Sequence, residues 1–160
     1  MLDLFASSSP GRKLRKWRQL TDRERLQLVQ LGFLLSFVWL GLRIFGFNRA
    51  RRWAEFALPA TPTPLSVEEI KRAEQCARLT GIAARSGLYH ANCLHQSLAL
   101  CRMLRSNGLP ALICIGVRPC TSPFQAHAWV ELEKVPVGQT VNEYSAFKSL
   151  TTSNKTKSTS

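Results

Sequence analysis

A long uncharged segment, Leu26–Leu42, constrains the fold of this chain more than any other feature. Its 17 residues contain no charged side chain, and an apolar run of that length must be covered by protein or by lipid. Thr21 followed by Glu24 matches a capping box, which predicts a helix that begins near Asp22. Apolar residues continue beyond the run, so we expect one hydrophobic helical segment over residues 22–56.

The length of this segment leaves three environments open for the helix. Its 17 uncharged residues lie at the lower limit for crossing a bilayer, which takes about 20. Basic clusters flank both ends, so charge does not define an orientation across a membrane. Packing against the rest of the protein or a partner is favoured over a position in the interface of an anionic membrane. A true span is favoured least. The segment also starts too far from Met1 for an ordinary signal peptide.

The net charge of +12 comes from 22 Lys and Arg against 10 Asp and Glu. Residues 1–52 hold 11 basic and 3 acidic side chains, whereas residues 53–160 hold 11 and 7. The basic character therefore belongs mainly to the N-terminal third, and it predicts an anionic partner. No Gly-rich, aromatic or helix-turn-helix motif accompanies the basic stretch Arg12–Arg25, so we do not expect the partner to be a nucleic acid.

The cysteine pattern indicates a reducing compartment such as the cytoplasm. There are five cysteines, an odd number, and no CxxC pair, which disfavours both a disulfide scaffold and a zinc ribbon. Apart from Cys93, they are expected to be packing or loop residues: Cys76, Cys101, Cys114 and Cys120.

Changes in composition divide the chain into five parts. We predict a flexible basic N-terminus over residues 1–21, the hydrophobic helical segment over 22–56 and a Pro-rich linker over 57–65. A single α+β core follows over residues 66–147. The Ser-, Thr- and Lys-rich residues 148–160 are expected to form a disordered tail.

Within the core, the pattern predicts two helices followed by three strands. A capping box at Ser66 and Glu69 starts the first helix, which ends near Gly87. The second helix covers Cys93–Asn107, with Gly108 as its C-terminal cap. The expected strands are an apolar run typical of a buried strand, an alternating segment, and a short strand reached through a turn around Gly138: Ala111–Val117, His127–Leu132 and Thr140–Glu143.

Cys93 has the position of a nucleophile, because it lies in the first turn of the second predicted helix. The helix dipole and the unpaired N–H groups of that turn favour a thiolate. His127 lies between two alanines at the start of a strand, which leaves room for a reacting group, and histidine is the most common general base for a thiol. Taken singly, a cysteine or a histidine in such a position is more often a packing residue.

A third group must orient the imidazole of a nucleophile–base pair. Glu143, at the end of the third predicted strand, is placed to accept a hydrogen bond from the ring of His127 across the hairpin, whereas Asn142 would point to the opposite face. A metal site is disfavoured, since the histidines and the cysteine match no standard ligand spacing: His90, Cys93, His95 and His127.

Two blocks of the sequence resemble those of a known protein family. The first, Asn92–Ala111, contains Cys-Leu-x-x-Ser-Leu-Ala-Leu, and the second, Pro123–Glu131, contains Ala-His-Ala-Trp-Val-Glu. In combination they resemble the transglutaminase-like leader peptidases of lasso-peptide biosynthesis. The resemblance extends over most of residues 22–147 and includes the hydrophobic N-terminal helix. It implies a papain- or transglutaminase-like α+β core and a Cys-His-Asp triad, in which Cys93 and His127 take the first two positions.

The third triad position departs from the pattern of that family, which commonly has an Asp after a Val-Asn pair. Val141-Asn142-Glu143 fits this block with Glu in place of Asp. If the hairpin is matched to the family pattern without a gap, Gln139 falls at this position instead. We take Glu143 as the third residue, with Asn142 and Gln139 as the alternatives.

The resemblance implies a cysteine endopeptidase without a cofactor. It would remove the leader from a ribosomally made lasso-peptide precursor and free the N-terminus of the core peptide for a separate ATP-dependent macrolactam cyclase. A separate PqqD-like protein would hold the leader, since residues 1–21 offer no room for such a domain. The enzyme would be cytoplasmic, with its N-terminal helix available for the inner face of the membrane. The alternative is a catalytically impaired transglutaminase-like adaptor that binds peptide or membrane.

Overall fold

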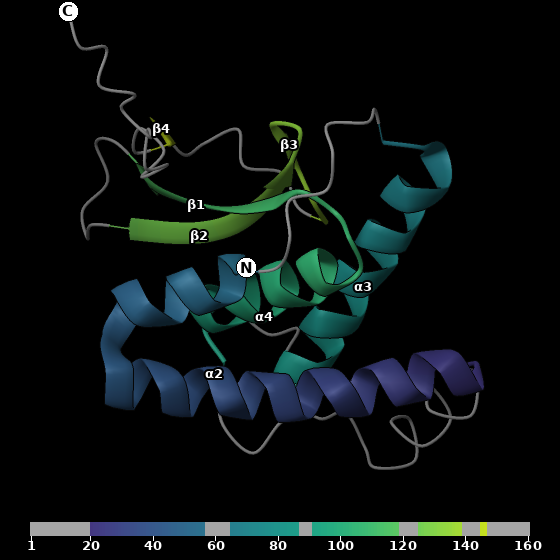
Figure 1. The fold of residues 1–160 in the computed structure, drawn as a ribbon, viewed down its shortest axis with the longest axis horizontal. Helices are drawn as coiled ribbons and strands as arrows, with labels where there is room; N and C mark the ends of the chain where they lie inside the picture. The colour runs from purple at the N-terminus through teal and green to yellow at the C-terminus, as the bar shows by residue number, and fades with distance from the viewer. Residues whose placement is uncertain (1–19, 57–64, 87–90, 119–124, 139–144, 147–160) are drawn as a thin grey trace, which may run out of the picture.

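A computed structural model describes residues 20–56, 65–86, 91–118, 125–138 and 145–146 of the chain. Within these ranges there are three helices and one antiparallel sheet, so the α+β prediction is confirmed. The sheet lies over α4, and α2 packs against α4 from the other side (Figure 1). The elements are α2 (Asp22–Glu55), α3 (Val67–Ser86), α4 (Cys93–Ser106), β1 (Ala111–Arg118), β2 (Gln125–Leu132), β3 (Val135–Pro136) and β4 (Ser145–Ala146).

Helix α2 begins as predicted and is interrupted once. The Thr21 hydroxyl accepts the Glu24 N–H, and the Glu24 carboxylate accepts the Thr21 N–H, which completes the capping box. Gly46 has a φ of 74° and a ψ of 174°, a conformation that glycine adopts without steric cost. At this residue the helix axis bends sharply, and the second arm of α2 turns back toward α4 (Figure 1).

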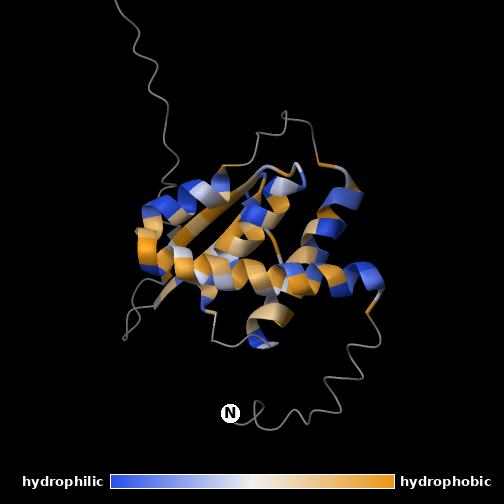
Figure 2. Ribbon diagram, turned by 60° about the horizontal axis from the view of Figure 1, so that its bottom comes forward, coloured by the Kyte–Doolittle hydropathy of each residue, from blue (hydrophilic) through white to orange (hydrophobic). Residues whose placement is uncertain are grey.

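One face of α2 belongs to the core of the protein. Leu28, Leu31, Leu35 and Val38 follow one another at steps of three and four residues, and all four are buried. They join the same core cluster as α3 and α4, as expected for one stripe of an amphipathic helix. Part of the apolar segment is therefore covered by the protein itself, while other apolar residues of α2 are exposed. Figure 2 shows hydrophobic residues, in orange, along much of this helix.

The two helices of the predicted core have the expected ends. The Ser66 hydroxyl and the Glu69 carboxylate form the second capping box at the start of α3. Helix α4 ends at Ser106, and Gly108 follows with a φ of 82°, the left-handed conformation of a helix C-terminal cap. Leu98, on the inner face of α4, is fully buried. Helix α4 therefore serves as the central element on which α2, α3 and the sheet pack.

The sheet has the strand order β3-β2-β1-β4, and every pairing within it is antiparallel. The expectation of a fully buried β1 is wrong for one of its faces. Ala111 and Ile113 are buried in the core, whereas Leu112 between them is 42% exposed. An apolar run does not reveal how many faces of a strand are covered, and the α4 core covers only one face of β1 at these positions.

Strand β2 also departs from its predicted pattern. Ala128, Trp129 and Val130 are buried in succession, so the expected alternation between a buried and an exposed face is wrong at the centre of the strand. The Trp129 indole N–H donates a hydrogen bond of 2.8 Å to the Glu131 carboxylate. This bond satisfies the polar atom of an otherwise buried ring.

The chain reverses direction immediately after β2, and not around Gly138 as the sequence predicts. Glu133 and Lys134 have φ values of 49° and 68°, and this two-residue turn connects β2 directly to β3. Two positive φ values are typical of a type I′ hairpin turn, which usually contains Asn or Gly, so the sequence carried no signal for it. Gly138 follows β3 with a φ of 73°. The predicted strand Thr140–Glu143 lies outside the described residues.

Candidate active site

The start of α4 holds Cys93 in a defined position. Asn92 is the N-cap residue: its side-chain oxygen accepts the His95 N–H at 3.1 Å, and its carbonyl accepts the Gln96 N–H at 3.1 Å. Cys93 is then the first helical residue, where backbone N–H groups have no partner within the helix. The thiol is half-buried, so it lies in a shielded position that remains open to a ligand.

The Asn92 side chain makes a second contact that stiffens this turn. Its oxygen also contacts Nδ1 of His95, and because an amide oxygen can only accept, the imidazole must donate from Nδ1. Burial lowers the pKa of His95, so its ring is neutral at pH 7 and retains one N–H for this bond. Asn92 therefore binds both the backbone and the side chain of the same residue in the first turn.

His127 is positioned by β2 and by its neighbour Trp129. It pairs across the sheet with Gly116 of β1. Its ring is stacked with the Trp129 ring at a centroid distance of 6.2 Å and an interplanar angle of 18°. The Trp129 indole is itself bound to Glu131, so the imidazole lies beside a ring whose orientation is restricted.

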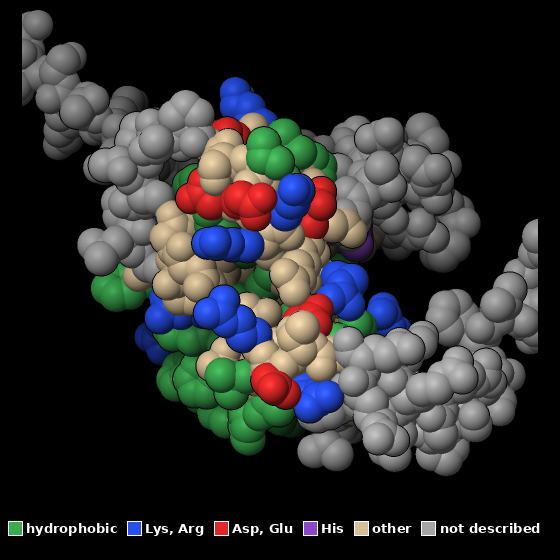
Figure 3. Space-filling model, turned by 90° about the vertical axis from the view of Figure 1, so that its right-hand side faces the viewer, with side chains coloured by type: hydrophobic (Ala, Val, Ile, Leu, Met, Phe, Trp, Pro, Cys, Tyr) green, Lys and Arg blue, Asp and Glu red, His purple; other side chains and the backbone are tan. Residues whose placement is uncertain are grey.

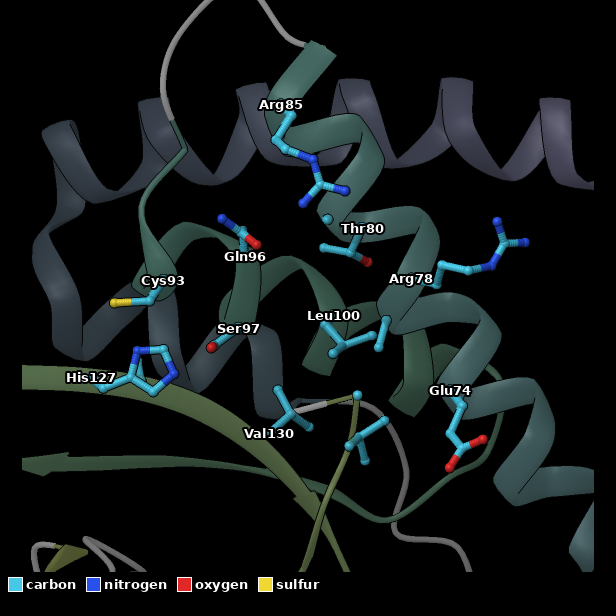
Figure 4. A pocket seen from close by; sticks show the side chains of 15 residues that line it. Glu74, Arg78, Thr80, Arg85, Cys93, Gln96, Ser97, Leu100, His127 and Val130 are labelled. Atoms are coloured by element: carbon cyan, nitrogen blue, oxygen red, sulfur yellow. The ribbon is translucent and has the colours of Figure 1, made fainter. Parts of the chain in front are cut away.

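Cys93 and His127 line one pocket of about 430 Å³ between α3, α4 and β2. Figure 4 shows the Cys93 side chain on the first turn of α4 and the His127 ring on β2 at the same end of this pocket. The structure thus brings together two predicted site residues that are 34 positions apart in the sequence. The remaining wall is formed by Glu74, Ala77, Arg78, Thr80, Gly81, Arg85, Gln96, Ser97, Leu100, Ala128, Val130, Val137 and Gly138.

The third predicted site residue follows a pocket residue, Gly138, in the sequence. Glu143 and the two alternatives, Asn142 and Gln139, lie outside the described residues. Gly138, which immediately precedes Gln139, lines the pocket. The chain therefore leaves the described part of the structure at the pocket wall.

Several pocket residues were not predicted from the sequence. Gln96 lies one turn after Cys93 on the same face of α4, and its side-chain amide donates to the Ala91 carbonyl at 2.8 Å. Helical spacing from Cys93 would have identified it. Arg85 comes from α3, and its guanidinium lies over Gly81, with Nη1 3.4 Å from where a Cβ of that residue would be. No local pattern indicates that α3 approaches the pocket, since this contact is made only by the tertiary fold.

The other described cysteines differ from Cys93 in their surroundings. Burial raises the pKa of Cys76 to about 11 and that of Cys101 to about 12. At Cys114, burial and then a hydrogen bond with Glu131 raise the pKa to about 12. Cys76 and Cys101 are part of the core cluster, which agrees with their expected packing role. Cys120 lies outside the described residues.

No metal-binding group is formed by the part of the chain that the structure describes. Among these residues, no three His, Cys, Asp or Glu side chains lie close enough together to hold an ion. His90, one of the four residues weighed as a ligand, is outside this part. The pocket contains a thiol and an imidazole, and backbone N–H groups lie at the start of α4 beside them.

The N-cap at Asn92 leads to a prediction for stability. Asn92→Ala removes the oxygen that accepts the His95 N–H, and we expect the free energy of unfolding to fall by about 1 kcal/mol, the usual cost of losing an N-cap. Asn92→Ser keeps a capping oxygen and should recover most of this loss. Urea denaturation of the three proteins measures the difference. Equal stabilities for the alanine and serine variants would contradict a capping role.

Comparisons with known proteins agree with the fold. A family model described as the transglutaminase-like superfamily matches residues 34–152, which is more than half of the chain. The microcin J25-processing protein McjB of Escherichia coli is 41% identical over 56 residues. That match covers 35% of this chain and 24% of the relative, so the chain spans about a quarter of the protein it resembles. No solved structure matches the chain.

Proposed function

The chain belongs to the transglutaminase-like superfamily, and from this premise we propose that it is a cysteine peptidase that removes the leader from a lasso-peptide precursor. The observation that carries the proposal is the common pocket of Cys93 and His127. A thiol in the first turn of a helix, with an imidazole across the same cavity, is the arrangement that nucleophilic catalysis by cysteine requires. The partial similarity to a protein named for microcin J25 processing supports the choice of substrate.

The proposed reaction begins with proton transfer from the Cys93 thiol to His127. The thiolate attacks the carbonyl carbon of the peptide bond between leader and core, and a tetrahedral oxyanion forms. Backbone N–H groups in the first turn of α4 stabilise this oxyanion, since they have no partner within the helix. His127 then gives its proton to the leaving amine as the C–N bond breaks, which frees the core peptide. The leader remains bound to Cys93 as a thioester.

A water molecule completes the cycle. His127 takes a proton from this water, whose oxygen attacks the thioester carbon. The C–S bond breaks, the leader leaves with a new carboxylate, and the thiol recovers its proton. Glu143 is our proposal for the residue that accepts the other ring N–H of His127, with Asn142 and Gln139 as the alternatives. An amide at this position would still orient the ring but would not stabilise the imidazolium by charge.

The proposed partners follow from the substrate. We propose that a separate PqqD-like protein presents the leader, and that a separate ATP-dependent cyclase uses the freed amine of the core. The reaction needs no cofactor, because a thiol, an imidazole and water supply every proton and electron pair. We place it in the cytoplasm, where precursor peptides are made and thiols stay reduced.

Thiol alkylation tests whether Cys93 carries this chemistry. At pH 8 the raised pKa values of Cys76, Cys101 and Cys114 leave roughly one thiolate in a thousand or fewer, and these thiols become reactive only as the pH rises toward 11. We therefore expect iodoacetamide at pH 6 to 8 to modify one site, Cys93, in a Cys120→Ser background. Intact-mass measurement and peptide mapping identify the site.

The same samples connect the modification to activity. A purified precursor peptide and its recognition partner are added before and after alkylation, and release of the leader is followed by mass. We expect release before alkylation and none after it. Release of the leader by the Cys93-alkylated protein would overturn the proposal. Slow alkylation spread over several cysteines, with an uncut precursor, would favour the catalytically impaired adaptor instead.

A further inference from the structure

Helix α2 has a second apolar stripe, on the side that faces away from the core. Its residues recur at steps of three or four, as the core-facing stripe does, and their exposed fractions range from 44% to 75%. In Figure 3 hydrophobic side chains gather at the lower edge of the molecule, where α2 lies, next to Lys and Arg side chains. We call the following residues the outer stripe: Leu26, Val29, Phe33, Phe37, Leu40 and Ile44.

The outer stripe is continuous and nearly free of polar groups. It is about 27 Å long at the rise of an α-helix. Ser36, at its margin, donates its hydroxyl to the Gly32 carbonyl at 3.0 Å, so this side chain is satisfied within the helix and does not depend on water. An exposed apolar surface of this length on a water-soluble protein marks an interaction site.

Apart from Asp22 and Glu24 in the first turn of α2, the charged side chains along the outer stripe are positive. From Arg25 to Ala54 the chain contains no acidic residue. Arg43, Arg49 and Arg52 are exposed, and among the described residues none of the three forms an ion pair. Hydrocarbon side chains along one line of a helix, with an excess of cations on the same helix, complement an anionic lipid surface.

We propose that the outer stripe of α2 lies flat in the interface of an anionic membrane. By its length and composition, the helix could cross a bilayer. However, Leu28, Leu31 and Leu35 on its other face are buried in the core, and a span would remove them from it. Binding in the plane of the membrane keeps these three leucines in the core of the protein and covers the outer stripe with lipid. No described residue of α2 lines the pocket, so the outer stripe is a separate surface.

Sedimentation with vesicles tests the proposal on the full chain. The probes are vesicles of phosphatidylcholine alone and vesicles with 30 mol% phosphatidylglycerol, a composition chosen for the assay on the order of that in anionic membranes. We expect the protein to sediment with the anionic vesicles, and we expect Phe33→Ser/Phe37→Ser/Leu40→Ser to weaken this partitioning at least about 30-fold. The matched control is Val67→Ser/Val135→Ser, which changes similarly exposed apolar residues on α3 and β3 and should partition as the wild type does.

Two further measurements separate a surface helix from other arrangements. Arg43→Gln/Arg49→Gln/Arg52→Gln should reduce binding to anionic vesicles and make it less sensitive to salt, and washing at pH 11 should release the bound wild-type protein. Absence of vesicle binding, or equal binding by the stripe variant and the control, would overturn the proposal. Retention after the pH 11 wash would show a span instead. Self-association in the absence of lipid, abolished by the stripe variant, would show that a second copy covers the stripe.

Discussion

The Cys93→Ala variant is expected to release no leader from a precursor peptide supplied with its recognition partner. We expect kcat/KM to fall at least about ten-thousand-fold, because Cys93 is the only thiol among the described residues that line the pocket. The thiol is only half-buried, so removing it should change the free energy of unfolding by less than about 1 kcal/mol. Leader release is measured by mass spectrometry and stability by urea denaturation, on the same preparation.

Two further variants test whether the loss of activity is specific to the proposed nucleophile and its base. His127→Ala removes the proposed base and should reduce leader release by a similar factor, since the nucleophile and its base act as a unit. Cys114→Ser changes a thiol that is also half-buried but lies on β1, outside the pocket, and should retain activity. Leader release by Cys93→Ala at an appreciable rate would show that the nucleophile is elsewhere. Full activity of His127→Ala would remove this residue from the mechanism.

The Gly138→Ala variant is expected to lose about 3 kcal/mol of stability and most of its leader release. Gly138 has a φ of 73°, where a side chain costs roughly 1 to 2 kcal/mol. A Cβ there would lie 2.6 Å from the Cβ of Ala77 on α3, so α3 and this loop would have to move apart. Overpacking of this kind adds about 1 to 3 kcal/mol. Both residues line the pocket, and its shape would change.

Gly108 provides the matched control for this prediction. Its φ is 82°, but a Cβ there would meet nothing within 4 Å, so Gly108→Ala should cost only the backbone strain of about 1 kcal/mol. Ala77→Gly, combined with Gly138→Ala, should recover the part of the loss that comes from the collision. Urea denaturation of the four proteins measures these differences. Equal losses at Gly108 and Gly138 would contradict the close approach of Gly138 to α3.

The helices of this protein could be predicted well because their signals are local. The capping boxes at Thr21 and Ser66 and the left-handed Gly108 each depend on residues within one helical turn, and the structure has all three. The hairpin turn at Glu133 and Lys134 was missed, because neither residue usually adopts a positive φ. That conformation is imposed by the pairing of β2 with β3.

The candidate site could be predicted only in part. Cys93 was identified from its place at a helix start, and His127 from its place on a strand and the resemblance of its surroundings. The wall contributed by α3, with Ala77 and Arg85, was not foreseen, because tertiary packing decides which faces of two consecutive helices meet. The third residue of the triad, Glu143, remains a prediction.

Local sequence signals were sufficient to predict a hydrophobic helical segment over residues 22–56 and a later helix that begins at a cysteine. These properties follow from hydrophobic periodicity and capping, which act over a few residues. Tertiary packing, by contrast, determines that Leu31 enters the core while Phe33 stays on the surface, and that Cys93 and His127 share a pocket. Burial of a side chain depends on which other elements pack against it, and these tertiary contacts form only when the whole chain folds.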